Sequence, residues 1–228
     1  MLNQKKKTNK MKTAIIIGAT GLIGRFLTIK LLKDVRYDIV KVFVCRSMGI
    51  TNPKLEEHIV DFDNIELWKN KIVGDELFSA MGTTIKKAGN KETQYKIDFT
   101  YQYEVAIAAS ENGVEKFLLV SSVGANPIAG NFYLRIKGKL EERVLKLSFK
   151  KIFIFKPSIL LGKRNEKRSG EQVGIFIAKV ITGLVPFIKK FRPIDGETVA
   201  DAMINSANDM THGKVMIYKL DQIFQIAL

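Results

Sequence analysis

The sequence predicts an α/β protein, a doubly wound parallel sheet with a small C-terminal cap. Three observations lead to this fold class. Short aliphatic runs alternate with helix-like segments along most of the chain, and a glycine-rich turn directly follows the first run. The runs are continuously apolar, which is typical of strands that are covered on both faces. Such alternation favours parallel strands joined by right-handed helical crossovers.

The expected elements alternate between strand and helix. Gly113 can take the left-handed conformation that ends the helix before it. Strands are expected at Ala14–Ile17, Ile39–Val44, His58–Val60, Glu76–Met81, Lys116–Val120, Ile152–Phe155 and Lys214–Tyr218, and helices at Leu22–Lys33, Ile97–Asn112, Asn131–Leu147, Gly174–Gly183 and Thr198–Asn208.

The composition fits one globular domain in a reducing compartment. The chain has 228 residues, of which 46% are hydrophobic and 26% charged. Residues 1–12 are basic and are expected to form a disordered lead-in to a single domain at 13–228, with cap elements within 157–228. The one cysteine, Cys45, cannot form an internal disulfide, and it is expected to be a small buried residue at a strand end. We therefore expect a cytoplasmic protein, a monomer or a homodimer.

Integral membrane segments, specific nucleic-acid binding and metal sites are not expected. The longest apolar run, 173–188, contains Lys179 and Pro186 and is shorter than the ~20 residues that span a bilayer. The net charge is +14, but the lysines are scattered, so attraction to a phosphorylated cofactor explains it better than nucleic acid. His58 and His212 lack cysteine or carboxylate companions at ligand spacing.

A glycine-rich turn between the first strand and the first helix predicts a cradle for a dinucleotide pyrophosphate. Gly18, Gly21 and Gly24 are spaced for a tight turn, a close backbone approach to phosphate and close packing of helix on strand. The helix N-terminus then directs its free N–H groups at the phosphate oxygens. No Gly-Lys-Ser/Thr follows, which argues against a nucleoside-triphosphate loop. Cofactor contacts are expected from Gly18, Thr20, Gly21, Leu22, Ile23, Gly24 and Arg25.

The residues after the second strand favour NADP(H) over NAD(H). An acidic residue there would hold the ribose 2′-hydroxyl, but the chain has Cys45-Arg46-Ser47. Arg46 and Arg25 are suited to pair with a 2′-phosphate, and the alternative is that both are plain surface residues. Asp61 and Phe62 are expected at the adenine, and Gly82, Thr83 and Thr84 along the phosphate and ribose channel.

A phenol, an ammonium and a hydroxyl later in the chain predict proton transfer. Tyr133 and Lys137 lie four residues apart on an expected helix and so share a face. The lysine would lower the pKa of the phenol from its ordinary value of about 10, and would also hold the nicotinamide ribose. Ser122, at the end of a strand, would polarise a substrate carbonyl, and the neighbouring Ser121 is more simply a residue that closes the strand end.

Several motifs together resemble the atypical short-chain dehydrogenases/reductases, closest to the Tat-interacting oxidoreductase-like proteins and their bacterial relatives. The resemblance covers roughly residues 13–220. It implies a Rossmann fold, NADP(H) binding, a catalytic set of Ser122, Tyr133 and Lys137, and a segment from Pro157 to Ile159 beside the nicotinamide. Lys156 departs from the arginine that is common there. The motifs are Gly18–Gly24, Val60–Phe62, Met81–Gly89, Leu119–Ala125, Phe132–Glu141 and Phe155–Gly162.

The function expected is NADPH-dependent reduction of a small, apolar carbonyl or quinone, with Tyr133 as proton donor. The substrate pocket would be lined by 123–132 and by the apolar stretch 172–181. One alternative is an NADP(H)-binding redox sensor or interaction protein without significant turnover. Another is a nucleotide-sugar epimerase-like enzyme, although the short C-terminal part leaves little room for a sugar nucleotide. A third is peripheral membrane attachment through the basic, apolar segment 179–192.

Overall fold

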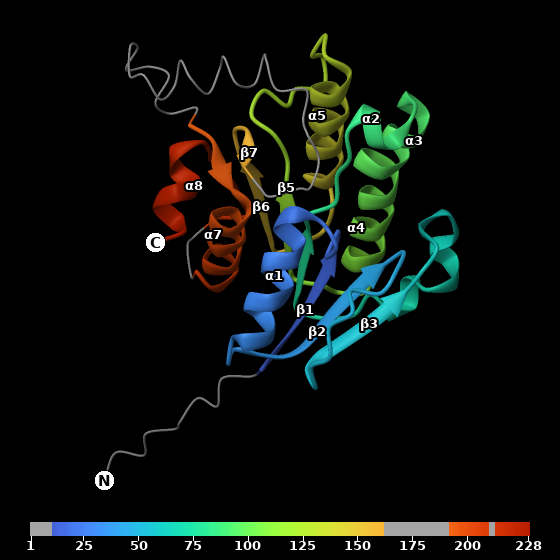
Figure 1. The fold of residues 1–228 in the computed structure, drawn as a ribbon, viewed down its shortest axis with the longest axis vertical. Coiled ribbons are helices and arrows are strands. Elements are labelled where there is room, and N and C mark those ends of the chain that lie inside the picture. The colour runs from blue at the N-terminus through green and yellow to red at the C-terminus, as the bar shows by residue number, and fades with distance from the viewer. Residues whose placement is uncertain (1–10, 162–191, 210–212) are drawn as a thin grey trace.

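The computed structural model describes residues 11–161, 192–209 and 213–228. Its centre is a seven-stranded sheet in the order β3-β2-β1-β4-β5-β6-β9, with every neighbouring pair parallel (Figure 1). This confirms the doubly wound α/β fold class. The strands are β1 (Lys12–Ile17), β2 (Tyr37–Val44), β3 (Leu55–Ile59), β4 (Glu76–Ser79), β5 (Lys116–Val120), β6 (Lys151–Lys156) and β9 (Val215–Lys219), with β7 (Leu160–Leu161) and β8 (Ile194–Asp195) paired separately.

Helices cover both faces of this sheet. The bounds are α1 (Leu22–Lys33), α2 (Ile85–Ala88), α3 (Lys91–Tyr95), α4 (Tyr101–Glu111), α5 (Phe132–Val144), α7 (Gly196–Asn208) and α8 (Asp221–Ile226), with 3-10 turns η1 (Phe62–Leu67) and η2 (Lys69–Lys71) and a π-helical turn η3 (Lys96–Thr100). In Figure 1, α1 and α7 lie on one side of the sheet, and α4 and α5 on the other.

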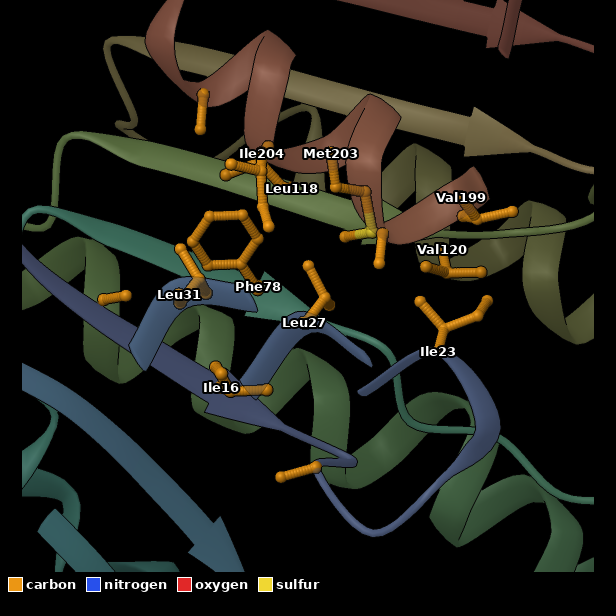
Figure 2. Packing of buried hydrophobic residues seen from close by; sticks show 14 of the residues in the cluster. Ile16, Ile23, Leu27, Leu31, Phe78, Leu118, Val120, Val199, Met203 and Ile204 are labelled. Carbon is orange, nitrogen blue, oxygen red and sulfur yellow. The ribbon is translucent and has the colours of Figure 1, made fainter. Parts of the chain in front are cut away.

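The aliphatic strands form two hydrophobic cores because successive side chains point to opposite faces. Ile16 of β1 packs with Phe78, Leu118 and the α1 and α7 side chains, whereas Ile15 and Ile17 pack with the α4 and α5 side chains. Figure 2 shows the first core, in which Leu27 and Leu31 of α1 and Met203 and Ile204 of α7 meet over the sheet. The C-terminal ends of the strands therefore form one edge, fixed by packing on both sides.

Several element boundaries differ from the sequence predictions. The third strand, expected at His58–Val60, is Leu55–Ile59, and the fourth ends at Ser79 rather than at Met81. The expected helix Ile97–Asn112 begins earlier, at Lys91, and passes through η3 before α4. Propensity patterns do not signal a π-helical turn, which is rare and occurs mostly as a single turn inside an α-helix. The helix α8 and the short pair β7 and β8 were not expected.

Some predictions fall on residues that the structure does not describe. The helix at 174–183, the pocket stretch 172–181, the apolar run 173–188 and the lead-in 1–10 lie outside the described ranges, as does nearly all of the segment 179–192. In the parts of the chain that are described, no helix is long and apolar enough to cross a membrane.

A buried polar network ties the N-terminal edge of the sheet to the end of α7. Glu76 of β4, 1% exposed, accepts hydrogen bonds from Tyr37 Oη at 2.5 Å and from Lys12 Nζ at 2.9 Å. Asn208 Nδ2 donates to Tyr37 Oη at 3.0 Å, and Lys116 Nζ donates to Glu76 at 3.2 Å. Burial, together with the Glu76 carboxylate, raises the pKa of Tyr37 far above its usual range. The phenol therefore stays protonated and acts as a structural donor.

His58 of β3 occupies an apolar, stacked position. Its ring lies on Phe43 of β2 with centroids 4.8 Å apart, and Phe43 in turn stacks on Trp68 at 5.1 Å. The Nε2 atom is buried and has no hydrogen-bond partner in the described part of the chain. Burial lowers the pKa of His58, Lys71 adds to the effect, and Glu56, at 3.9 Å, opposes it. The fold thus favours the neutral imidazole.

We predict that the free energy of unfolding falls as the pH is lowered through about 6.5, the ordinary histidine pKa. The unfolded chain then binds a proton that the folded His58 resists, so stability present above this pH is lost below it. Urea unfolding of wild type and His58→Gln between about pH 5 and about pH 8 measures this. A stability difference between the two proteins that does not change with pH would contradict it.

Candidate dinucleotide and catalytic site

The glycine-rich turn closes on backbone alone. Gly18 has φ +78°, and Gly21 N donates to its carbonyl at 2.9 Å. A Cβ on Gly24 would lie 2.1 Å from Gly18 O, and one on Gly18 would lie 2.5 Å from Met81 N. Gly21, the N-cap of α1, supplies no side-chain acceptor to the first helical N–H groups. An anion is therefore the natural acceptor at this helix end.

The other residues of this turn divide between the core and a cavity. The Ile23 side chain, 4% exposed, packs in the core with side chains of α7. Leu161, Phe26 and Ile29 supply apolar walls to a cavity of about 760 Å³. It is further lined by Thr20, Gly21, Leu22 and Arg25 from the turn and α1, and by Asp195, Gly196 and Glu197 at the start of α7. Arg25 thus lies on the α7 side of α1.

The tip of β2 is open to solvent. Cys45, Arg46 and Ser47 are all exposed, so the prediction that Cys45 is a small buried core residue is wrong. The burial of β2 ends one residue earlier, at Val44. Partial burial, with the charge of Asp61 next, raises the pKa of the Cys45 thiol. Arg46, which is expected to meet the ribose 2′-phosphate, therefore presents an exposed guanidinium, and neither Cys45 nor Ser47 beside it carries a carboxylate.

Asp61 and Phe62 begin η1 and are engaged locally. Asp61 Oδ1 accepts from Asp63 N at 3.0 Å, and its Oδ2 accepts from Asn64 Nδ2 at 2.7 Å. The Phe62 ring, 4% exposed, packs against Trp68 with centroids 5.3 Å apart. The Phe62 side chain is therefore a core residue, and this position has only backbone groups to offer a nucleotide.

The loop after β4 lies over the expected catalytic lysine. A Cβ on Gly82 would lie 3.7 Å from Lys137 Nζ, and Lys137 Nζ donates to Met81 O at 3.4 Å. Thr84 caps α2 by accepting from Lys87 N. Met81 thus lies against Gly18 of the glycine turn with its N–H side and against Lys137 with its carbonyl. Met81 alone therefore lies between the glycine turn and the expected catalytic lysine.

The expected catalytic set comes from β5 and α5. Asn131 Oδ1 caps α5 by accepting from Leu134 N at 3.1 Å, which starts the helix that carries Tyr133 and Lys137 on one face. Ser122 follows β5, and its Oγ donates one long hydrogen bond, 3.3 Å, to Val123 O. Val123 N donates to Pro157 O at 3.0 Å.

The hydrogen bond from Val123 N to Pro157 O holds the segment after β6 beside Ser122. Ile159 lies two residues beyond Pro157, and its carbonyl accepts from Ile194 N at 3.0 Å.

Lys137 is buried as an ion pair. It is 2% exposed, and its Nζ lies 3.0 Å from Oδ1 of Asp98, a residue of η3 that is 0% exposed. Burial lowers the pKa of Lys137, but the Asp98 charge and then the Tyr133 phenol raise it, and the net pKa lies above the ordinary value. The Asp98 carboxylate therefore favours the ammonium form of Lys137.

Sequence reasoning missed Asp98. A signal was present: Gln94, Asp98 and Gln102 repeat at a spacing of four, and all three are buried. Ser79 Oγ donates to Gln102 Oε1 at 2.8 Å, and Thr83 N donates to Asp98 Oδ2 at 3.2 Å. A polar stripe at helical spacing that faces strand ends indicates a site rather than a solvated face.

A second buried network lies on the same helix. Lys156 Nζ contacts Glu141 Oε2 at 2.7 Å and donates to Ala125 O at 3.2 Å. Ser121 Oγ donates to the other oxygen of Glu141. Glu141 therefore joins the ends of β5 and β6 to α5, and Ser121 closes the strand end. Lys156, which stands where the resembled family commonly has arginine, keeps an ion pair with this carboxylate.

The loop between β5 and α5 is also held by α5. Arg135 Nη1 donates to Ala129 O at 2.7 Å and to Gly130 O at 3.0 Å. A Cβ on Gly138 would lie 2.2 Å from Asn126 C, so this loop packs directly on the helix backbone. Ile128 at its tip is 86% exposed. Among the described residues no group of three His, Cys, Asp or Glu side chains is arranged for a metal ion.

The parallel sheet with helices on both faces defines a Rossmann-like α/β fold. Solved structures share the fold. One is WbmH of Bordetella bronchiseptica in complex with NAD+, with TM-score 0.67, 18% identity, and 92% of this chain and 75% of that chain covered. Another is a superfamily protein of Agrobacterium tumefaciens with bound NAD, with TM-score 0.69, 13% identity, and 91% and 77% covered. A UDP-N-acetylglucosamine 4-epimerase of Methanobrevibacter ruminantium has TM-score 0.65, 17% identity, and 95% and 81% covered.

Curated relatives show the family. The chain is 36% identical over 215 residues to "Protein FMP52, mitochondrial" of Debaryomyces hansenii. The match covers 91% of this chain and 93% of the relative. It is 31% identical over 230 residues to the protein of the same name in Candida albicans, with 94% and 98% covered. The chain belongs to the FMP52 family. No protein-family model matches it.

These relatives overturn one prediction. The expected cytoplasmic location is wrong, because the names of the relatives place them in mitochondria. The expectation rested on a single cysteine. One cysteine excludes an internal disulfide, but it does not distinguish one reducing compartment from another.

We predict that Gly24→Ala destabilises the protein by more than about 2 kcal/mol, because the added methyl meets the Gly18 carbonyl and neither backbone can retreat. In an ordinary helix interior the same change stabilises by roughly 0.5–1 kcal/mol. Urea unfolding measures the difference. Gly130→Ala is the matched control, because a Cβ there meets nothing within 4 Å. A Gly24→Ala protein as stable as the control would contradict the packing described.

Proposed function

We propose that the protein is an NADPH-dependent reductase that transfers a hydride to a small, apolar carbonyl compound or quinone, with Tyr133 as proton donor. The observation that carries this proposal is the position of Met81. Its N–H side lies against Gly18 and its carbonyl accepts from Lys137, so the expected cofactor cradle and the expected catalytic helix meet at one residue. A dinucleotide on the turn would extend directly toward Lys137 and Tyr133.

The residues of the turn fit a dinucleotide. The space that side chains would fill at Gly18 and Gly24 is taken by backbone, and the uncapped N-terminus of α1 provides N–H donors for a pyrophosphate. When bound, the reduced cofactor supplies the hydride. Gly82, Thr83 and Thr84 would line the ribose side, Pro157 and Ile159 the nicotinamide side, and Asp61 the adenine end.

The side chains around the carbonyl then have separate roles. Ser122, whose hydroxyl makes one long hydrogen bond, would turn to donate to the carbonyl oxygen. The carbonyl carbon receives the hydride, and its oxygen receives the proton of Tyr133, which gives an alcohol and the oxidised dinucleotide. Lys137 stabilises the phenolate that remains, and the proton is returned from solvent.

The preference for NADPH rests on the tip of β2. Arg46 is exposed there and no carboxylate follows the strand directly, so a 2′-phosphate would gain a charge-assisted hydrogen bond. Arg25 lines the cavity beside α7, and we assign it a role at the pyrophosphate rather than beside Arg46. We further propose that the protein works in mitochondria, as the names of its relatives say of them.

A second candidate is an epimerase-like enzyme, favoured by the fold shared with a UDP-N-acetylglucosamine 4-epimerase. Such an enzyme would use the same three residues but return the hydride to its substrate. Steady consumption of NADPH distinguishes the reductase from it. Tight NADPH binding without any turnover would favour a redox sensor.

We predict that Arg46→Glu weakens NADPH binding by about ten- to a hundredfold and leaves NADH binding nearly unchanged, because only NADPH carries the 2′-phosphate. Fluorescence titration of both dinucleotides measures the two constants. Arg143→Glu, an exposed change near the end of α5, controls for net charge. Equal weakening of NADPH in both variants would remove the specific role of Arg46.

We predict that Tyr133→Phe lowers turnover by at least about a hundredfold on any aldehyde, ketone or quinone that wild type reduces, with NADPH binding retained. Oxidation of NADPH followed by absorbance measures turnover. Tyr103→Phe is the control, because the Tyr103 ring packs at a tilt against Phe99 of η3, with centroids 5.7 Å apart. If Tyr133→Phe kept its turnover, the phenol would not be the proton donor.

A further inference from the structure

The segment that follows β6 is tied to residues that come much later in the chain. Leu220 N donates a hydrogen bond to Lys156 O at 3.4 Å. Two residues further on, Ser158 Oγ donates to Arg192 O at 2.5 Å. Residues 157–159 are expected beside the nicotinamide, so both hydrogen bonds lie at the border of the proposed cofactor site.

Arg192 connects this segment to α8. Its guanidinium carbon lies 3.7 Å from the centre of the Phe224 ring, and its Nε atom lies 3.6 Å from Asp221 Oδ1. A guanidinium over an aromatic face is attracted electrostatically by the ring. Arg192 therefore contacts Ser158 through its backbone and Phe224 through its side chain.

Helix α8 is a firm support for this contact. Ile223 is 0% exposed and packs in the core with side chains of α7. Asn205 Nδ2 of α7 donates to Ile226 O, at the end of α8, at 2.9 Å. In Figure 1, α8 lies beside α7. The Phe224 ring thus belongs to a helix that is anchored by a buried side chain and by a hydrogen bond at its end.

The turn that leads into α8 is strained. Leu220 has φ +51° and ψ −117°, in the half of backbone space that residues other than glycine rarely adopt. Such a conformation persists where the surrounding structure enforces it, and such residues gather at functional sites. Here Lys219 N donates to Gln222 Oε1 at 2.9 Å, and Ile223 N donates to Leu220 O at 3.1 Å. This turn sets the direction in which α8 leaves β9.

We propose that Arg192 and Phe224 are positioning residues of the cofactor site, which hold residues 157–159 in the conformation that receives the nicotinamide ring. The inference rests on the proposed function for the identity of the ligand. A segment that is held in its binding conformation needs no ordering when the ring binds. Loosening the segment lowers the fraction of molecules that are ready to bind the ring, and the apparent affinity falls by the same factor.

The test compares NADPH with ADP-ribose 2′-phosphate, which lacks only the nicotinamide ring. Titration calorimetry measures both dissociation constants. Phe224→Ala is expected to weaken NADPH binding about threefold to tenfold, the effect of one cation–ring contact, and to leave the other constant within about a factor of two. Phe224→Tyr keeps the ring and is expected to bind NADPH as wild type does. A loss of affinity for both ligands, or for neither, overturns the proposal.

Two further variants separate this contact from a general effect on α8. Arg192→Ala is expected to weaken NADPH binding as much as Phe224→Ala does, and the double variant no more than either, because both changes remove the same contact. Gln225→Ala, an exposed change on the same helix, is the matched control and is expected to leave both constants unchanged. Additive losses in the double variant would show that the two side chains act separately, which overturns the proposal.

Amide hydrogen exchange tests the segment without any ligand. Ile194 N donates to Ile159 O, so its exchange rate reports how firmly the segment is held. Phe224→Ala is expected to speed this exchange about threefold to tenfold and to leave that of Val60, which donates to Val44 O beside β3, unchanged. Equal rates at Ile194 in variant and wild type overturn the proposal. A wild type that binds neither ligand refutes the proposed function, and the exchange then decides alone whether α8 holds the segment.

Discussion

Backbone segments pack directly against one another around Gly18, and the rest of the site depends on this contact. The missing side chain of Gly18 makes room for Ala80 and Met81 at the end of β4, and Gly24 makes room for Gly18 in turn. Helix α1 is consequently pressed onto the sheet with its N-terminus at the C-terminal edge. Because Met81 also accepts a hydrogen bond from Lys137, the same contact fixes the distance between the N-terminus of α1 and the α5 residues. The geometry of the site therefore depends on the absence of a side chain at Gly18 and at Gly24.

Beneath the site, four ionisable side chains are buried as two pairs. Lys137 and Glu141 lie one turn apart on α5, and their partners, Asp98 and Lys156, come from η3 and β6. Each carboxylate balances an ammonium, so a region almost closed to water carries no net charge. This arrangement also ties α5 to both sides of the β5 end, where Ser121 and Ser122 stand. Removing one partner would strand a buried charge, which typically costs about 3–5 kcal/mol.

The sequence was sufficient for the parts of the fold that have a local signal. Aliphatic runs predicted the central strands, and the spacing of Gly18, Gly21 and Gly24 predicted the turn, because only glycine meets those steric demands. Cys45 was wrongly placed in the core, since the point at which a strand leaves the core is a tertiary property. Asp98 was missed although Gln94, Asp98 and Gln102 repeat at a spacing of four, because that repeat marks a polar stripe without identifying its partner. Its role depends on a partner 39 positions away in the chain, and no local pattern reports such a pairing.

The buried pair bears on the choice between a reductase and a sensor. Moving an ammonium and a carboxylate out of water is expensive, and apolar residues of similar size would commonly hold a helix against a sheet equally well or better. A protein that only binds a dinucleotide needs phosphate donors and a ribose contact, which the turn and the loop after β4 offer near the surface. Beyond the ribose contact expected of Lys137, a buried ammonium on the same helix face as a phenol is placed to support proton transfer. For this reason we favour chemistry over sensing.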